Sequence, residues 1–230
     1  MSTLPTVSDT KRKFYQHHTR PIHSVYRQVV EELLVEMHLL SVNVDFSYDP
    51  IYALGIVSTF DRFMEGYRPD ADKTSIFEAL CRSTSGDPQQ YRQDSERIGA
   101  IADGLSGEEM TALLTDPEST TVGGELRDRV LEITRKESFK YSRLFGIGLF
   151  NLLERSDAKL TESEKERKAA LEKIGDRLGL PQEKLIKDLE LYRGNLEKMR
   201  QARQVIAEAI ASDRKKREER EQQKATSNEQ

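Results

Sequence analysis

Residues 48–67 read YDPIYALGIVSTFDRFMEGY, and this stretch decides the fold. Asp49 can cap a helix, and Pro50 suits the first turn, where its missing N–H costs nothing. Gly66 and Pro69 then predict where that helix ends. The stretch is therefore expected to form a single helix of about five turns.

The side chains of this predicted helix are apolar over most of its surface. Polar residues form only a narrow stripe at helical spacing, namely Ser58, Asp61, Arg62 and Glu65. A helix with such a wide apolar surface must be surrounded by other elements. We therefore expect it to be the central helix of a soluble bundle, with Ile56, Phe60 and Phe63 buried.

Length and composition exclude several classes of protein. The chain has 230 residues, a third of them charged, and a net charge of −4, which does not indicate nucleic-acid binding. The single cysteine, Cys81, excludes internal disulfides and cysteine-based zinc sites. The N-terminus lacks the apolar segment of a secretory signal, and the longest apolar run, 144–153, is too short to span a membrane. We expect a soluble protein whose membrane attachment, if any, is peripheral.

The rest of the first 157 residues also predicts helices. Apolar residues repeat at helical spacing over 22–40, and Ser106 with Glu109 forms a capping box. The second strongly apolar segment, 139–154, is expected to pack on the central helix, with Gly146 and Gly148 letting the two backbones approach. No alternating run bounded by hairpin turns is present, so the fold class is all-α.

The composition changes near Thr161 to a mixture rich in Glu, Lys, Arg, Ala and Leu, and Thr161 with Glu164 predicts another capping box. After the turn at 179–181, a heptad seam follows in steps of four and three: Leu185, Leu189, Tyr192, Leu196, Met199, Arg203, Ile206 and Ile210. We predict a bundle domain over 1–157, a helical hairpin with a long coiled-coil-like C-terminal helix over 158–217, and a disordered tail over 218–230. The seam is expected to pack on the preceding helix of the hairpin, and a partner helix is the alternative.

Arg203 interrupts the seam and suggests where a partner could bind. In a hairpin it would lie near the open end, level with Thr161, where an acidic group could pair with it. The seam beyond it, Ile206 and Ile210, would then have no partner within the hairpin. We predict that this end binds another protein, so that aspartate at both positions would weaken partner binding without changing the thermal melt.

Candidate catalytic and metal-binding groups do not assemble into a motif. A di-iron bundle needs Glu-x-x-His, which is absent, and the adjacent His17 and His18 would point apart on a helix. Cys81 lies on an amphipathic segment and is expected in the core. The sequence Gly146-Ile147-Gly148 lacks the third glycine of a phosphate loop. We predict no catalytic residues, cofactor or metal. The alternative is a cofactor- or metal-dependent helical-bundle enzyme, which metal analysis of the pure protein would reveal.

A basic run near the N-terminus is a candidate membrane surface. It comprises Lys11, Arg12, Lys13, Arg20 and Arg27, with only Asp9 as a local acid. Basic clusters of this size can lie on anionic lipid headgroups. An ordinary charged face of a bundle is the alternative interpretation.

Several long blocks resemble one known family. They are TVSDTKRKFYQ, VYRQVVEELLVEMHLLSVN, YDPIYALGIVSTFDRFMEGYRP, IFEALCRSTSGDPQQYRQD and FKYSRLFGIGLFNLLE, which together cover much of 6–154. In this order they resemble the thylakoid formation family, also called the photosystem II biogenesis family, of cyanobacteria and chloroplasts. The resemblance continues more loosely through the hairpin. A transit peptide is not apparent, so we expect a cyanobacterial member.

The resemblance carries expectations about function. It implies an all-helical, peripheral protein at the cytoplasmic side of the thylakoid membrane, with a soluble cytoplasmic pool. It also implies a role in photosystem II assembly and repair, exercised by binding and stabilising membrane-bound FtsH-type protease complexes. The family has no catalytic motif to carry over to this sequence.

Overall fold

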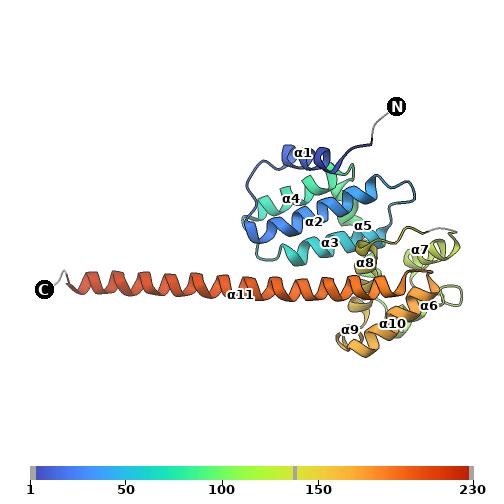
Figure 1. Cartoon of the computed structure of the whole chain (residues 1–230). Coiled ribbons are helices and arrows are strands. Elements are labelled where there is room, and N and C mark those ends of the chain that lie inside the picture. The colour runs from blue at the N-terminus through green and yellow to red at the C-terminus, as the bar shows by residue number, and fades with distance from the viewer. Residues whose placement is uncertain (1–3, 137–138, 228–230) are drawn as a thin grey trace. The chain divides into compact units, whose positions relative to one another are not determined.

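The structure, a computed structural model, describes the backbone of residues 4–136 and 139–227, and their side chains except at 210, 213 and 215–227. Within these residues every regular element is a helix, which confirms the all-α prediction (Figure 1). The helices are α1 (Val7–His17), α2 (Ser24–Ser41), α3 (Pro50–Phe63), α4 (Asp70–Ser83), α5 (Pro88–Asp103), α6 (Gly107–Thr115), α7 (Gly124–Arg135), α8 (Arg143–Ser156), α9 (Ala158–Glu162), α10 (Glu164–Arg177) and α11 (Gln182–Ser227).

The chain forms two compact units, Met1–Tyr192 and Arg193–Gln230. The first unit therefore includes α9, α10 and the start of α11, whereas the sequence analysis ended the bundle at residue 157. The reason is that α9 packs on α8 and α10 packs on α6. The change in composition near Thr161 reflects the polar outer faces of these short helices and does not mark a boundary in packing.

Helix α3 begins as its sequence predicts, and it ends at Phe63, three residues before Gly66. The Asp49 side chain accepts a hydrogen bond from the Ile51 N–H at 2.7 Å, and Pro50 occupies the first turn. After the helix, Gly66 adopts a positive φ of 76°, which glycine tolerates without strain. The predicted core residues of α3 are buried, with exposed fractions of 0% for Ile56 and Phe60 and 7% for Phe63.

Helix α8 packs closely on α3, as predicted, because glycines lie at the contact. A Cβ atom on Gly148 of α8 would lie 2.0 Å from the carbonyl oxygen of Ile51 in α3. The contact is reciprocal, since a Cβ on Gly55 of α3 would lie 1.8 Å from the carbonyl oxygen of Leu144 in α8. Gly146, which the sequence analysis placed at the same contact, instead lies beside Tyr141 and Leu185.

Of the two predicted capping boxes, one forms and the other does not. Ser106 and Glu109 exchange side-chain and backbone hydrogen bonds at the start of α6, as predicted. Thr161 is not a helix cap, so that prediction is wrong. Asp157 caps the short helix α9, and Ser163 caps α10. Thr161 instead lies inside α9. Two helices begin in this region, where a single helix start was predicted.

The first part of α11 belongs to the bundle. Leu185, Leu189 and Tyr192 are buried, as a seam requires. Leu185 lies against Gly146 of α8, and the Tyr192 ring meets the Phe63 ring of α3 with centroids 5.9 Å apart. This part of the seam therefore packs on the bundle, where a contact with the preceding helix of the hairpin, or with a partner helix, was predicted.

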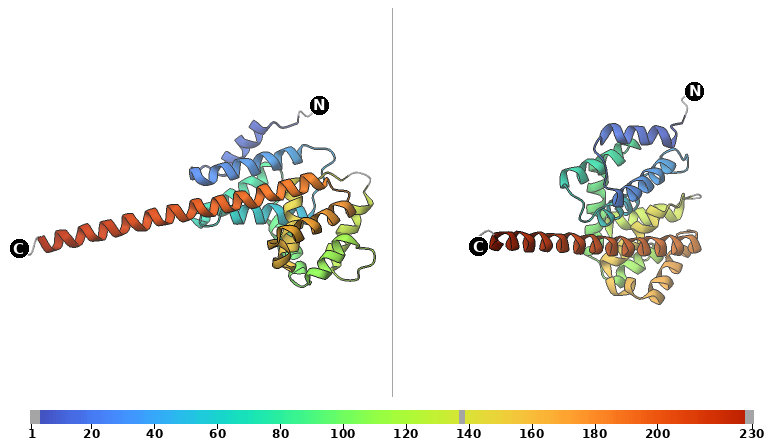
Figure 2. Two further views of the ribbon diagram at one scale, coloured as in Figure 1. Left: turned by 60° about the horizontal axis from the view of Figure 1, so that its bottom comes forward. Right: turned by 60° about the vertical axis from the view of Figure 1, so that its left-hand side comes forward.

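Helix α11 is continuous from Gln182 to Ser227, and Figure 2 shows it without a break from two further directions. It runs past Arg217, where the sequence analysis expected a disordered tail to begin. The residues involved, Glu, Lys, Arg, Gln and Ala, all have good helix propensity, so their mixed charges do not prevent a helix.

Candidate functional site

The basic residues near the N-terminus have more acidic partners than the sequence suggested. Lys11 Nζ lies 3.0 Å from a carboxylate oxygen of Glu31 in α2. Arg20 lies 2.5 Å from a carboxylate oxygen of Asp72 in α4. Helices distant in sequence thus supply two acids in addition to Asp9, the local acid of this run.

The remaining cations of the run differ in their surroundings. Arg12 pairs with Asp9 at 2.7 Å on the exposed side of α1, and Arg27 donates to the Ile22 carbonyl oxygen at 3.2 Å. Lys13 is exposed on α1. The run is thus a charged surface partly neutralised by its own neighbours, and its predicted contact with a membrane stays a prediction.

Two buried histidines fasten α1 to the helices beside it. Thr10 Oγ1 lies 2.8 Å from Nδ1 of His38 in α2, and both residues are buried. Nδ1 of His18, just after α1, lies 3.0 Å from the Ser75 hydroxyl of α4, while its Nε2 is buried without a hydrogen-bond partner among the described residues. These polar contacts fix α1 at both of its ends.

The environment of His18 favours its neutral form. Burial lowers the pKa of His18 from 6.5, and the guanidinium of Arg20 acts in the same direction. The carboxylate of Asp72 opposes both effects. A protonated ring would carry its positive charge and an unsatisfied Nε2–H into a site that is only 2% exposed.

The native pKa of His18 predicts a loss of stability in mild acid. The unfolded chain binds a proton at His18 as the pH falls through 6.5, whereas the native chain does so only at lower pH. The free energy of unfolding should therefore decrease as the pH falls below 6.5, until the native His18 also binds a proton. Urea unfolding of wild type and His18→Gln across this range tests the idea. If the free energy of unfolding changed equally with pH in the two proteins, the idea would be contradicted, since the other histidines are common to both.

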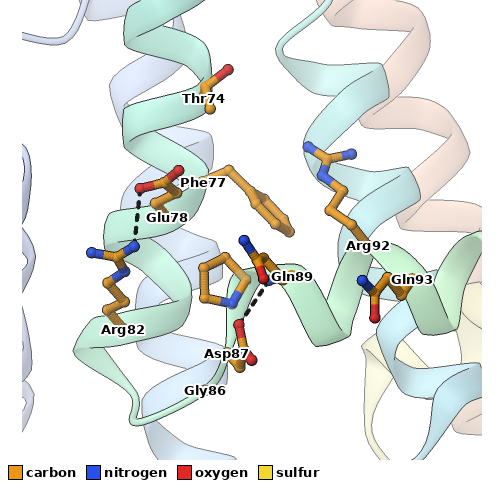
Figure 3. A pocket seen from close by; sticks show the side chains of 10 residues that line it. Thr74, Phe77, Glu78, Arg82, Gly86, Asp87, Gln89, Arg92 and Gln93 are labelled. Atoms are coloured by element: carbon orange, nitrogen blue, oxygen red, sulfur yellow. Dashed lines mark hydrogen bonds and ion pairs between the residues drawn. The ribbon is translucent and has the colours of Figure 1, made fainter.

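A hollow on the first unit lies between α4 and α5 (Figure 3). Its volume is about 960 Å³, and it is lined by Thr74, Phe77, Glu78, Arg82, Gly86, Asp87, Pro88, Gln89, Arg92 and Gln93. Figure 3 shows Arg92 reaching from α5 towards the Phe77 ring, whose centroid lies 4.0 Å from the guanidinium carbon.

The cations of this hollow are balanced within the protein. Arg92 donates two hydrogen bonds to the Asp61 carboxylate of α3, one of them at 3.0 Å. Arg82 pairs with Glu78 one helical turn away, at 3.3 Å. The hollow thus presents amides and neutralised ion pairs, which do not select an anionic ligand.

Cys81 of α4 is fully buried, as predicted. Burial raises the pKa of its thiol to about 12, which leaves almost no thiolate at neutral pH. Across residues 4–136 and 139–227, no three histidine, cysteine or acidic side chains gather as metal ligands would. No helix in the same part of the chain is both long and apolar enough to cross a bilayer.

A buried polar cluster holds the start of α11. The Tyr141 hydroxyl donates to the Asp188 carboxylate of α11 at 3.0 Å, and burial together with this carboxylate raises the pKa of Tyr141. Nearby, Arg143 of α8 donates to the Glu36 carboxylate of α2 at 2.7 Å, while burial raises the pKa of Glu36. The first contact attaches α11 to the segment just before α8, and the second joins α8 to α2.

The second unit exposes apolar side chains near the predicted partner-binding end of the seam. The exposed fraction is 43% for Ile206 and 64% for Val205. The side chain of Ile210 lies outside the described residues. The pairing of Arg203 with an acid near Thr161 stays a prediction. Val205 was not predicted because a heptad pattern identifies only the positions of the seam. Val205 lies one residue before Ile206 and is therefore outside the seam.

Comparison with known proteins identifies the family. The family model described as thylakoid formation protein matches residues 6–221. The protein named Thf1 of a Nostoc species is 56% identical over 226 residues, covering 98% of this chain and 97% of the relative. Thf1 of Trichormus variabilis is also 56% identical over 226 residues, with the same coverage. The solved structure of Psb29 superimposes with a TM-score of 0.79 at 41% identity, covering 93% of this chain and 98% of that one. The chain therefore belongs to the thylakoid formation protein family.

Proposed function

We propose that the protein is a non-enzymatic accessory factor in thylakoid formation that acts in photosystem II assembly and repair. It does so by binding and stabilising membrane-bound FtsH-type protease complexes. The observation that carries the proposal is the family match over residues 6–221, which covers most of both structural units. The exposed Val205 and Ile206 of the second unit offer a surface on which such a partner could bind.

The proposed location is the cytoplasmic side of the thylakoid membrane, with peripheral attachment and a soluble pool. The family name and the exposed cations of α1 support it. Attachment would arise through the protease partner, with electrostatic contact between the basic run and anionic lipids as a second contribution.

Direct membrane binding, where it occurs, should be sensitive to salt. Binding to anionic vesicles should disappear at 1 M salt, where the screening length is about 3 Å. Lys13→Glu should weaken binding more than Lys168→Glu, a matched change on α10, which lies far from α1 in Figure 1. Vesicle flotation measures both effects. Binding that persists at 1 M salt, or equal loss in the two variants, would contradict an electrostatic role for this run.

The proposed function is tested by removing the protein from a cyanobacterium. The amount of assembled FtsH-type complex should fall in the deletion strain and recover when the wild-type chain is restored, as native gels with immunodetection would show. A tagged chain should also co-purify with protease subunits from detergent-solubilised thylakoids. Normal levels of the complex in the deletion strain, together with no co-purified protease, would overturn the proposal.

A further inference from the structure

Helix α1 is fastened to the bundle by a face that is largely polar. Thr10, Phe14 and His18, the residue that caps its C-terminal end, follow one another at intervals of four, so they share one side of the helix. Their exposed fractions are 2%, 1% and 2%. Thr10 meets His38 of α2 and His18 meets Ser75 of α4, each through one hydrogen bond, and only Phe14 is apolar. A helix fastened mainly by one ring and isolated hydrogen bonds belongs to the less stable parts of a fold.

The charge of this helix is masked by acids that belong to other helices. Lys11 pairs with Glu31 of α2 at 3.0 Å, and Arg20, in the segment after α1, pairs with Asp72 of α4 at 2.5 Å. Residues 7–23 themselves contain four cations and one acid, Asp9, which gives a net charge of +3 with neutral histidines. Docking on α2 and α4 therefore neutralises a positive charge that α1 and the segment after it carry on their own.

The connection between α1 and the other helices allows it to separate. Residues 18–23 join α1 to α2 and form no helix, so α1 can leave while α2 and α4 keep Glu31 and Asp72. On the separated helix, Val7 and Phe14 lie on one face, and Arg12 and Lys13 lie towards the other. Short basic amphipathic helices of this kind lie flat at the headgroup level of anionic membranes.

An anionic membrane would replace most of what α1 gives up in the bundle. Phe14 would move from one apolar environment to another, so its ring would stay out of water. The four cations of residues 7–23 would face lipid phosphates in place of two carboxylates. One aromatic ring does not hold a protein on a bilayer by itself, so binding would still depend on charge and weaken with salt.

We infer that α1 is a detachable helix that separates from α2 and α4 and binds the surface of an anionic lipid bilayer. Phe14 then points towards the acyl chains, and Lys11, Arg12 and Lys13 lie among the headgroups. The docked form, in which Phe14 is buried, is the form in solution. This inference rests on the proposed function for the claim that the protein contacts lipid directly, and it adds which form of α1 makes the contact.

A chemical cross-link between α1 and α2 tests the inference on the full-length protein. Lys11→Cys together with Glu31→Cys places two thiols where the native side chains meet, and both sites are 39% exposed. A flexible bis-maleimide would join them, whereas Cys81 is fully buried and does not react. The control is the same double variant capped with a monofunctional maleimide, which leaves the charge identical and α1 free to separate.

Flotation with vesicles of phosphatidylglycerol and phosphatidylcholine in equal amounts measures the effect. The cross-linked protein should bind about tenfold more weakly than the capped protein, because the docked helix keeps Phe14 buried and Arg20 paired. Circular dichroism should show the same helix content for both proteins in solution. Equal binding of the two proteins would overturn the inference, as would equal binding of the capped protein to vesicles of phosphatidylcholine alone.

A second pair of variants loosens α1 without changing its sequence or any charge. Ser75→Ala removes the hydrogen bond of α4 to His18, so amide hydrogen exchange of residues 7–17 should become about fivefold faster. Vesicle binding should strengthen by a similar factor, because apparent affinity follows the fraction of the competent form. Ser83→Ala deletes a hydroxyl that bonds only within α4, to the Leu80 carbonyl oxygen, and should change neither quantity. Equal effects of the two substitutions, or none from Ser75→Ala, would overturn the inference.

These measurements separate the inference from the proposed function. If the cross-linked and capped proteins bind vesicles equally, the detachable helix is wrong and direct lipid contact stands. If neither protein binds, the inference falls together with direct lipid contact, while co-purification of the protease still decides the proposed function. If the capped protein binds as expected and the protease neither co-purifies nor depends on the protein, the proposed function is wrong and the membrane-binding helix stands.

Discussion

Gly148→Ala should destabilise the first unit severely. The added methyl group would lie 2.0 Å from the Ile51 carbonyl oxygen and 2.9 Å from its carbonyl carbon, both backbone atoms of α3. Neither α3 nor α8 can move away without opening the centre of the bundle, where both are buried. We expect a loss of about 3 kcal/mol or more, at the upper end for overpacking. Gly55→Ala should behave alike, and the double variant should not fold, since native stability is only about 5–15 kcal/mol.

Gly194→Ala provides the matched control for this prediction. Gly194 lies inside α11, and a Cβ there would meet nothing within 4 Å. Alanine favours a helix over glycine by about 1 kcal/mol, so this variant should be as stable as wild type or slightly more stable. Chemical denaturation followed by circular dichroism measures the free energy of unfolding of the four variants and of wild type. A loss below 1 kcal/mol for Gly148→Ala would show that the α3–α8 contact is looser than described.

Phe60→Ala should cost about 3–5 kcal/mol, because it removes a fully buried ring from the core. The Phe60 ring packs on the Phe77 ring of α4 with centroids 5.1 Å apart, so its loss leaves a cavity between two helices. Tyr15→Ala removes an aromatic ring that is 43% exposed on α1, and it should cost about 1 kcal/mol or less. Urea unfolding compares the two. Similar losses for Phe60 and Tyr15 would contradict the central position of α3.

The central helix could be predicted because its signals are local. Asp49, Pro50 and Gly66 mark its limits in the sequence, and the narrow polar stripe shows that most of its surface is buried. The close approach of α8 to α3 could also be predicted, because Gly148 within an apolar segment is a local signal. Its counterpart Gly55 was missed, because one glycine inside an apolar helix does not indicate which neighbour it faces.

Contacts between distant parts of the chain could not be predicted. Glu31 and Asp72 neutralise Lys11 and Arg20 only because α1 and the residues after it pack on both α2 and α4, which local spacing does not reveal. Likewise, the heptad pattern predicted that Tyr192 is buried without showing that its neighbour is α3. By contrast, the exposure of Ile206 at the end of the seam was predicted. It depends on where the packed region ends and not on the type of residue.

The most direct test of the account is the amount of FtsH-type protease that co-purifies with tagged variants from thylakoids. Ile206→Asp should reduce the recovered protease strongly while leaving the thermal melt unchanged, because this side chain is already 43% exposed. Val44→Asp makes a comparable change on a loop of the first unit, where the side chain is 94% exposed, and should leave recovery at the wild-type level. Undiminished recovery with Ile206→Asp, or equal loss with Val44→Asp, would contradict the claim that the protein binds its partner through the C-terminal helix.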